Sequence, residues 1–367
     1  QEVEEFARRQ GFKGELQRWD WAYYSNKLKQ EKYALDDEML KPYFKLENVQ
    51  QGVFGLANKL YGLTFKEVDN IAKYHEDVKT FEVYDRDGRF LAVLYTDFFP
   101  RESKGGGAWM TEFRGQHKKD GQDVRPLVSL VMNFTKPTAS KPSLLTFDEV
   151  TTFLHEFGHS LHGMLSQCTY NSTGGTNVYR DFVELPSQII ENWALEKEWL
   201  DTWAVHYQTG EKIPQEYITK IHEAANFQSG YQNDRQLSFG LVDMAWHSVT
   251  SPVNGSIQAF ENQAMAPTES FPPVDSSCFS TGFGHIFGGG YAAGYYSYKW
   301  AEVLDADAFS VFKQQGIYDQ ATAESFRKNI LEKGGSEHPM ILYKRFRGQE
   351  PTIDALLERS GLKSKSE

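Results

Sequence analysis

The segment HEFGH at residues 155–159 constrains this chain most, because it places two histidines four positions apart with a glutamate beside the first. Residues i and i+4 lie on one face of an α-helix. A helical segment would therefore bring the imidazoles of His155 and His159 together, where they could hold one divalent ion. Glu156 would lie one step round the helix, off the imidazole face.

The flanking residues predict that this segment is helical. Thr146 and Glu149 fit the Ser/Thr-x-x-Glu capping box that marks a helix start. Apolar residues then recur at helical spacing and predict one buried stripe, with the histidines beside it. The stripe consists of Phe147, Val150, Leu154, Phe157, Leu161 and Met164. Ordinary hydrogen-bonded histidines on an amphipathic helix are the alternative, but the pair with its adjacent glutamate favours a metal site.

His162 offers a third imidazole on nearly the same face. Seven residues separate it from His155, which corresponds to about 10.5 Å of rise along a helix. One ion with bonds near 2 Å cannot readily bridge that distance. We therefore expect His162 to pack near the site without binding the metal.

The predicted third ligand is Glu184, which follows His159 by 25 positions (184 − 159 = 25). It lies in RDFVELPSQIIENWAL, a segment that predicts a second buried helix with Pro186 near its start. A buried carboxylate needs a partner, and a metal ion is a suitable one. Other carboxylates nearby are alternatives that fit surface or outer positions better: Glu149, Glu191, Glu196 and Glu198. Two histidines and one glutamate leave a coordination position open, which is the catalytic pattern of zinc metalloproteases, with Glu156 as the general base.

Longer motifs add a family resemblance. HEFGH followed by DFVELPSQ resembles the thimet oligopeptidase family of zinc peptidases, and further segments agree: WDWAYYSNKL, LKPYFKLENV, FFPRESKGGG, NFTKPT and GHIFGGGYAAGYYSYKW. The GGGYAAGYY version is more similar to bacterial peptidyl-dipeptidases (dipeptidyl carboxypeptidases) than to animal endopeptidases. The resemblance implies a mainly α fold with a small β-sheet, of the zincin-type (HExxH) metallopeptidase class. It also implies one bound Zn²⁺ and hydrolysis of short peptides, with release of dipeptides from free C-termini.

By the same resemblance, His285, Tyr291 and Tyr298 line the catalytic centre. Their side chains are suitable donors to an oxyanion that develops in the transition state. A helix is predicted to start near Tyr291, which would place Tyr291, Tyr295 and Tyr298 on one face. Without the resemblance an aromatic packing stripe would be the simpler interpretation, and Tyr295 keeps that interpretation.

Two more residues match the family. Asp181 is expected to orient a ligand histidine, and Arg180 to bind substrate or to brace its loop. An exposed structural ion pair is the alternative for Arg180. A peptidyl-dipeptidase also needs a group for the substrate's free carboxylate. The candidates are Arg101, Arg180, Arg345 and Arg347.

Composition excludes some classes of protein. The formal net charge of −11 over 367 residues argues against general nucleic-acid binding. The two cysteines, Cys168 and Cys278, make no disulfide framework and fit reduced thiols in a cytoplasmic enzyme, with the periplasm as the alternative. No run of about 18 apolar residues predicts a transmembrane helix, so we expect no membrane partner.

The chain shows no clear domain linker, and we expect residues 1–367 to form one catalytic domain. Residues 1–78 read as helical, 79–134 as a small sheet, and 146–367 as mostly helical with the zinc site. DRDG at 85–88 predicts a hairpin, whereas ESKGGGAWMTEF (102–113) and HKKDGQD (117–123) predict turns or loops. The family resemblance implies that the strand ending VSLVMNF (128–134) is the edge strand that pairs with an extended substrate. A purely structural strand is the alternative.

Members of the resembled family usually carry a long helical segment before the region seen here. We therefore expect this chain to be the C-terminal catalytic part of a larger peptidase, with the missing N-terminal helical part and short peptides as its partners. Three alternatives remain open. They are cleavage of internal bonds in short peptides, a non-catalytic peptide-binding remnant, and a helical interaction module whose structural metal would need a fourth ligand such as Cys168.

Overall fold

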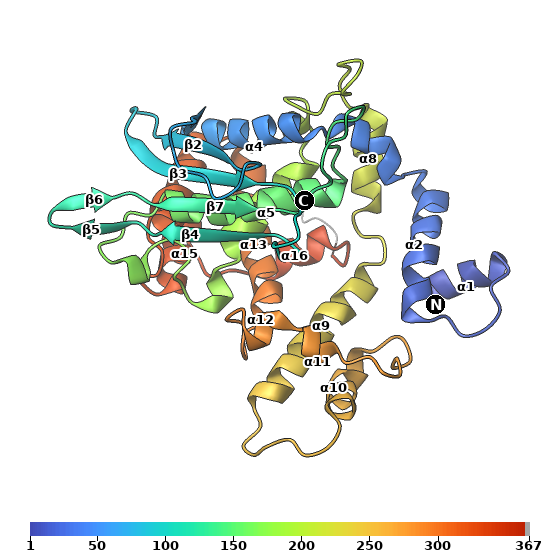
Figure 1. Ribbon diagram of the computed structural model, residues 1–367. Coiled ribbons are helices and arrows are strands. Elements are labelled where there is room, and N and C mark those ends of the chain that lie inside the picture. The colour runs from blue at the N-terminus through green and yellow to red at the C-terminus, as the bar shows by residue number, and fades with distance from the viewer. Residues whose placement is uncertain (364–367) are drawn as a thin grey trace. The chain divides into compact units, whose positions relative to one another are not determined.

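The computed structural model describes residues 1–363 of the chain (Figure 1). Those residues form two compact units. The first unit consists of residues 1–36 and 219–300, and the second of residues 37–218 together with the chain from residue 301 onward. No helix in the described range is long and apolar enough to cross a membrane.

The helices of the first unit are α1 (Glu2–Arg9), α2 (Arg18–Tyr33), α9 (Ser229–His247), α10 (Ile257–Met265), α11 (Phe279–Gly282) and α12 (Gly284–Phe287). Two of the three boundaries between the units fall inside helices: α8 (Gln215–Ala224) and α13 (Ser297–Gln315). The helices of the second unit are α3 (Asp37–Leu40), α4 (Leu46–Tyr61), α5 (Phe147–Met164), α6 (Leu185–Glu191), α7 (Lys197–Leu200), α14 (Gln320–Phe326), α15 (Pro339–Arg347) and α16 (Asp354–Arg359). The mainly helical fold with a small sheet that the sequence predicts is confirmed.

All described strands belong to the second unit: β1 (Thr64–Glu67), β2 (Lys79–Tyr84), β3 (Phe90–Asp97), β4 (Trp109–Arg114), β5 (His117–Lys119), β6 (Gln122–Val124) and β7 (Leu127–Val131). Five of them form a sheet in the order β1-β2-β3-β7-β4 (Figure 1). Only the β3–β7 pair is parallel. The predicted hairpin at DRDG is confirmed, because β2 and β3 pair antiparallel across it and Gly88 takes φ +80° in the turn.

The sheet differs from the sequence prediction in four places. The first strand already occurs at Thr64–Glu67, inside the range read as helical. The segment AWMTEF, predicted as loop, contains β4, and HKKDGQD holds a second hairpin, β5–β6, around Asp120 and Gly121. Both residues of that turn have positive φ, as a tight two-residue hairpin requires. The prediction that the strand ending VSLVMNF is an edge strand is wrong, because β7 lies between β3 and β4.

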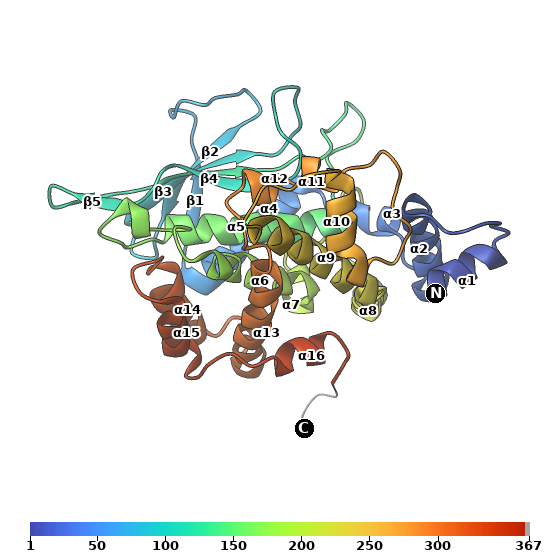
Figure 2. The same cartoon turned by 90° about the horizontal axis from the view of Figure 1, so that it is seen from below.

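Helix α5 lies between the sheet and α6 (Figure 2). The predicted capping box is present, with Thr146 and Glu149 each accepting a backbone N–H bond from the other. The predicted stripe is buried except for Phe147, which is half-buried. The contact with α6 is close at Gly158, where an added Cβ would lie 2.3 Å from the carbonyl oxygen of Pro186. The glycine of HEFGH therefore lets α6 approach α5 closely.

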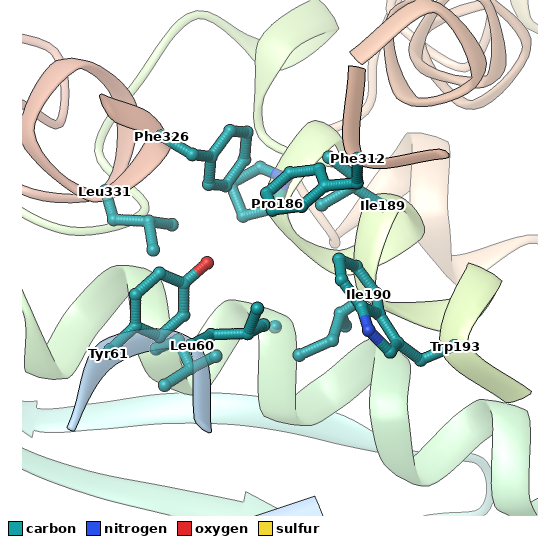
Figure 3. Close-up of a pocket in the computed structure, with 11 residues that line it drawn as sticks. Leu60, Tyr61, Pro186, Ile189, Ile190, Trp193, Phe312, Phe326 and Leu331 are labelled. Carbon is teal, nitrogen blue, oxygen red and sulfur yellow. The ribbon is translucent and has the colours of Figure 1, made fainter. Parts of the chain in front are cut away.

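Apolar side chains fill the far side of this helix pair and leave one small cavity of about 10 Å³ (Figure 3). A space of that size has room for about one water molecule. Figure 3 shows the Tyr61 hydroxyl directed into it, with Leu60 beneath and Phe312 and Phe326 above. This layer is core packing that holds α5 and α6 in place, and it is too small to be a substrate site.

Candidate metal centre and active site

Three side chains converge at the interface of α5 and α6. The Nε2 atoms of His155 and His159 lie 3.2 and 3.1 Å from Oε2 of Glu184. Two ligand atoms that are each 2.0–2.1 Å from a tetrahedral ion lie about 3.3 Å apart. The donor atoms of these residues all lie within 4.8 Å of one another, and they form the one group in the described range that could hold a metal ion. The spacing and the donor types therefore fit one zinc ion.

Glu184 precedes the first residue of α6 and is 1% exposed. The Ser187 hydroxyl donates to its Oε2 at 2.7 Å. Burial acts to raise the pKa of this carboxyl, but the two histidines outweigh burial and hold the pKa well below its usual range. The carboxylate is therefore ionised, and the site favours a cation between it and the imidazoles.

Glu191 orients the first histidine. Nδ1 of His155 donates to Oε1 of Glu191 at 2.6 Å, which leaves Nε2 directed at Glu184. A carboxylate behind a ligand imidazole fixes the tautomer and the ring orientation. Sequence reasoning gave this task to Asp181 and named Glu191 only among the alternatives. The spacing in the sequence could have indicated Glu191, because residues 184 and 191 are seven apart and so share a face after two turns of helix.

His162 is fully buried, and neither of its ring nitrogens has a hydrogen-bond partner in residues 1–363. Burial lowers its pKa to about 3, so the ring is neutral. It is not in the group of converging metal donors, in agreement with the prediction that it packs without ligating. Cys168 is also outside that group, and its Sγ donates instead to the carbonyl of Thr173 at 3.2 Å.

Glu156 lies beside the metal donors without joining them. It is 7% exposed and accepts a bond from the backbone N–H of Met110 on β4. Burial raises its pKa above the ordinary value. The side chain borders a pocket of about 390 Å³. The residues lining that pocket are Gly107, Ala108, Thr151, Thr152, His155, Glu156 and Glu191.

Comparison with known proteins settles the family. The sequence profile of peptidase family M3 matches residues 1–362. The chain belongs to peptidase family M3. This confirms the family resemblance that the sequence motifs indicate.

Two curated relatives illustrate the match. Oligopeptidase A of Escherichia coli is 46% identical over 357 residues, which is 95% of this chain and 52% of that protein. Dipeptidyl carboxypeptidase of Salmonella typhimurium is 43% identical over 350 residues, which is 95% of this chain and 51% of that protein. The chain thus spans about half the length of the curated relatives it matches.

Among solved structures, an M32 carboxypeptidase from Deinococcus radiodurans aligns with a TM-score of 0.50 at 15% identity. The alignment covers 93% of this chain and 66% of that one. At that identity the likeness concerns the fold alone.

One wall of the pocket beside Glu156 is a glycine-rich loop, and hydrogen bonds hold this loop in place. Lys104, whose side chain is 1% exposed, donates to Oδ1 and to the carbonyl of Asp97 at 3.0 Å each. The Asn133 amide donates to the carbonyls of Gly105 and Gly107 at 2.9 and 2.7 Å. These bonds fix the loop that leads into β4. The sequence prediction did not include the Asn133 anchor, because Asn133 lies 28 and 26 residues from Gly105 and Gly107 along the chain.

Three of the four candidate arginines already pair with carboxylates: Arg101 with Asp97, Arg345 with Glu337 and Arg347 with Asp307. Arg101 makes two bonds of 2.9 Å to its partner, which is the bidentate geometry of a strong guanidinium–carboxylate pair. The carboxylates that pair with Arg101 and Arg347 are buried, at Asp97 and Asp307.

The remaining predicted site residues lie in the first unit, whereas the metal donors lie in the second. The Tyr291 and Tyr298 rings stack with centroids 5.1 Å apart, and His285 lies edge-on to Tyr298 at 6.2 Å. The predicted helix from Tyr291 is wrong, because α13 begins at Ser297 and Tyr291 lies in the turns before it. Turn geometry brings these rings together where a helix face was expected.

Proposed function

We propose that this protein is a zinc-dependent peptidase that hydrolyses short peptides and releases dipeptides from free C-termini. The observation that carries the proposal is the convergence of His155, His159 and Glu184 beside Glu156, in a chain of peptidase family M3. A relative named dipeptidyl carboxypeptidase, 43% identical, supports the release of dipeptides. Cleavage of internal bonds is the second candidate, supported by the 46% identity to oligopeptidase A.

In this proposal each residue has one task. When bound, zinc acidifies a water molecule and polarises the scissile carbonyl. Glu156 takes a proton from the attacking water and delivers it to the leaving amine. The Met110 N–H holds the Glu156 carboxylate in place for that transfer. Tyr298, with Tyr291 and His285, donates to the oxyanion of the transition state, as the family resemblance implies.

The substrate backbone is proposed to pair with β4. This strand pairs with β7 on one side, and no strand of the described residues occupies its other edge. Its Met110 N–H contacts Glu156, so the open edge runs beside the proposed catalytic group. An extended peptide can add to such an edge through main-chain hydrogen bonds. We therefore propose β4, and not the VSLVMNF strand predicted from the sequence, as the strand that pairs with substrate.

The activity of the whole protein is part of the proposal, because the match covers about half of each relative. We propose that residues 1–367 act as the C-terminal catalytic domain of a larger peptidase. A helical N-terminal part would then form the opposite wall of the substrate channel. Such a wall would position the peptide and exclude water from the reaction.

The test combines metal analysis with turnover. Glu156→Gln should keep one zinc per chain while kcat falls by roughly 10²–10⁴, the usual contribution of a general acid–base group. Glu102→Gln, at an exposed glutamate on the loop before β4, is the matched control and should keep wild-type turnover. Wild-type activity in Glu156→Gln, or no zinc in the wild-type protein, would overturn the proposal.

Two peptides separate the two candidate activities. One carries a free C-terminal carboxylate and the other an amidated C-terminus, with the same sequence. Mass spectrometry of the products should show dipeptide release from the free peptide and little cleavage of the amidated one. Equal cleavage of both peptides would establish the internal-bond activity instead.

A further inference from the structure

The loop between α12 and α13 has an unusual backbone. We call residues 288–296 the tyrosine loop, since it contains Tyr291 and Tyr295 and leads directly to Tyr298. Ala293 in this loop has φ +51°, in the left-handed region that residues other than glycine rarely adopt. Such a conformation persists only where neighbouring groups hold it.

The group that holds it is Asp243, on α9. This carboxylate is 1% exposed. Its Oδ1 accepts the backbone N–H of Ala293 at 2.9 Å, and its Oδ2 accepts the backbone N–H of Tyr295 at 2.8 Å. Nδ1 of His247, one helical turn further along α9, lies 2.7 Å from Oδ1. One buried carboxylate therefore binds two amides of the loop, and hydrogen bonds to an ionised acceptor are stronger than neutral ones.

Aromatic packing extends this anchor to the rings. The Tyr295 ring packs edge-on against Phe239, one turn before Asp243 on α9, at 5.6 Å, and against Phe283 at 5.0 Å. Tyr298 in turn lies 5.1 Å from Tyr295 and stacks on Tyr291. The backbone of the loop and the positions of its rings thus both depend on α9.

We propose that Asp243 is a positioning residue of the peptidase, which holds the tyrosine loop so that Tyr291 and Tyr298 present their hydroxyls to the transition state. The inference rests on the function proposed above for these two tyrosines. Asp243 acts through the loop, because both of its amide partners are backbone groups of the loop. The left-handed turn at Ala293 directs the two amides at one carboxylate.

The first variant is Asp243→Asn, measured in the zinc-loaded protein. An amide has a single acceptor oxygen, so one of the two loop bonds is lost while the side-chain shape is kept. We expect kcat to fall at least tenfold with KM within about twofold, because a misplacement of about 1 Å can cost up to about a hundredfold. Zinc should remain at one per chain, since its ligands lie in the other unit. Asp234→Asn, at an exposed aspartate of the same helix, is the matched control and should behave as wild type.

Two further variants separate positioning from folding. Ala293→Gly in the Asp243→Asn background should recover part of the lost kcat, because glycine adopts the left-handed turn at no steric cost. Ala293→Val keeps the carboxylate and changes an exposed side chain, yet its branched Cβ disfavours φ +51°. It should lower kcat as Asp243→Asn does. Hydrogen exchange at the Ala293 and Tyr295 amides should accelerate in both single variants. A role in folding alone would lower the melting temperature and would leave kcat per zinc-loaded molecule unchanged.

Tyr298→Phe, measured in parallel, distinguishes a failure of the positioning role of Asp243 from a failure of the oxyanion role proposed for the tyrosines. If it loses kcat while Asp243→Asn and Ala293→Val turn over like the wild type, the positioning role is wrong and the proposed function stands. If Tyr298→Phe retains full kcat, the proposed oxyanion role fails and the inference about Asp243 fails with it.

Discussion

Burial of the Glu112 carboxylate on β4 should lower the free energy of unfolding by an amount that can be measured. Its Oε1 is buried and has no hydrogen-bond partner in the described part of the chain. A Cβ added at Gly163 or Gly175 would lie 2.6 or 2.3 Å from that oxygen, so the carboxylate packs directly against glycine backbone. Burial with no compensating partner raises the pKa of Glu112 from its ordinary value of 4.5 to about 7.

This shift predicts how stability depends on pH. The folded protein holds the Glu112 proton more tightly than the unfolded chain does. The contribution of protonated Glu112 to the free energy of unfolding is therefore fully present below about pH 4.5 and is lost as pH rises to about 7. At 1.36 kcal/mol per pH unit, the rise from 4.5 to about 7 corresponds to about 3 kcal/mol at most. Partial exposure of the side chain lowers the expected loss to about 1–3 kcal/mol.

The perturbation is Glu112→Gln, which removes the titration and keeps the side-chain length. Urea unfolding of both proteins at pH 5, 6, 7 and 8 gives the difference in free energy of unfolding at each pH. The variant should gain stability relative to wild type between pH 5 and 7, and the difference should be level above pH 7. Glu102→Gln, at an exposed glutamate, should show no such trend. If wild type and Glu112→Gln stay parallel from pH 5 to 8, Glu112 titrates as it does in water and the burial argument is refuted.

Three further predictions concern α5 and α6, the helices that hold the candidate metal donors. Glu184→Gln should lose most of its zinc on gel filtration while His162→Ala keeps one ion per chain; the reverse result by metal analysis would show that the ligand set is misassigned. Glu191→Gln should weaken zinc binding by roughly 10–100-fold in chelator competition, and unchanged affinity would mean that its bond to the ligand imidazole is incidental. Gly158→Ala should destabilise the fold by about 1–3 kcal/mol, since the new methyl would lie 2.3 Å from the Pro186 carbonyl oxygen; a wild-type melting temperature would contradict that contact.

The sequence alone was sufficient for features that depend on near neighbours. The capping box at Thr146 and the 3.6-residue period predict α5, and the same period places His155 and His159 side by side. The turn at DRDG is equally local. Glu184 was predicted as the third donor because a buried carboxylate on a predicted helix needs a partner, and the structure places it within 3.2 Å of both imidazoles. These conclusions hold because helix and hairpin geometry is determined over a few consecutive residues.

Tertiary structure decided what depends on distant partners. AWMTEF becomes a strand only by pairing with β7, and that pairing makes β4 the edge beside Glu156 and puts β7 inside the sheet. The tyrosine loop departs from the predicted helix because Asp243, some 50 residues earlier, accepts its amides. Local propensities favour one conformation over another by only about 1 kcal/mol per residue. A strand partner or a buried carboxylate outweighs that preference, and a linear sequence does not indicate which distant partner will be adjacent.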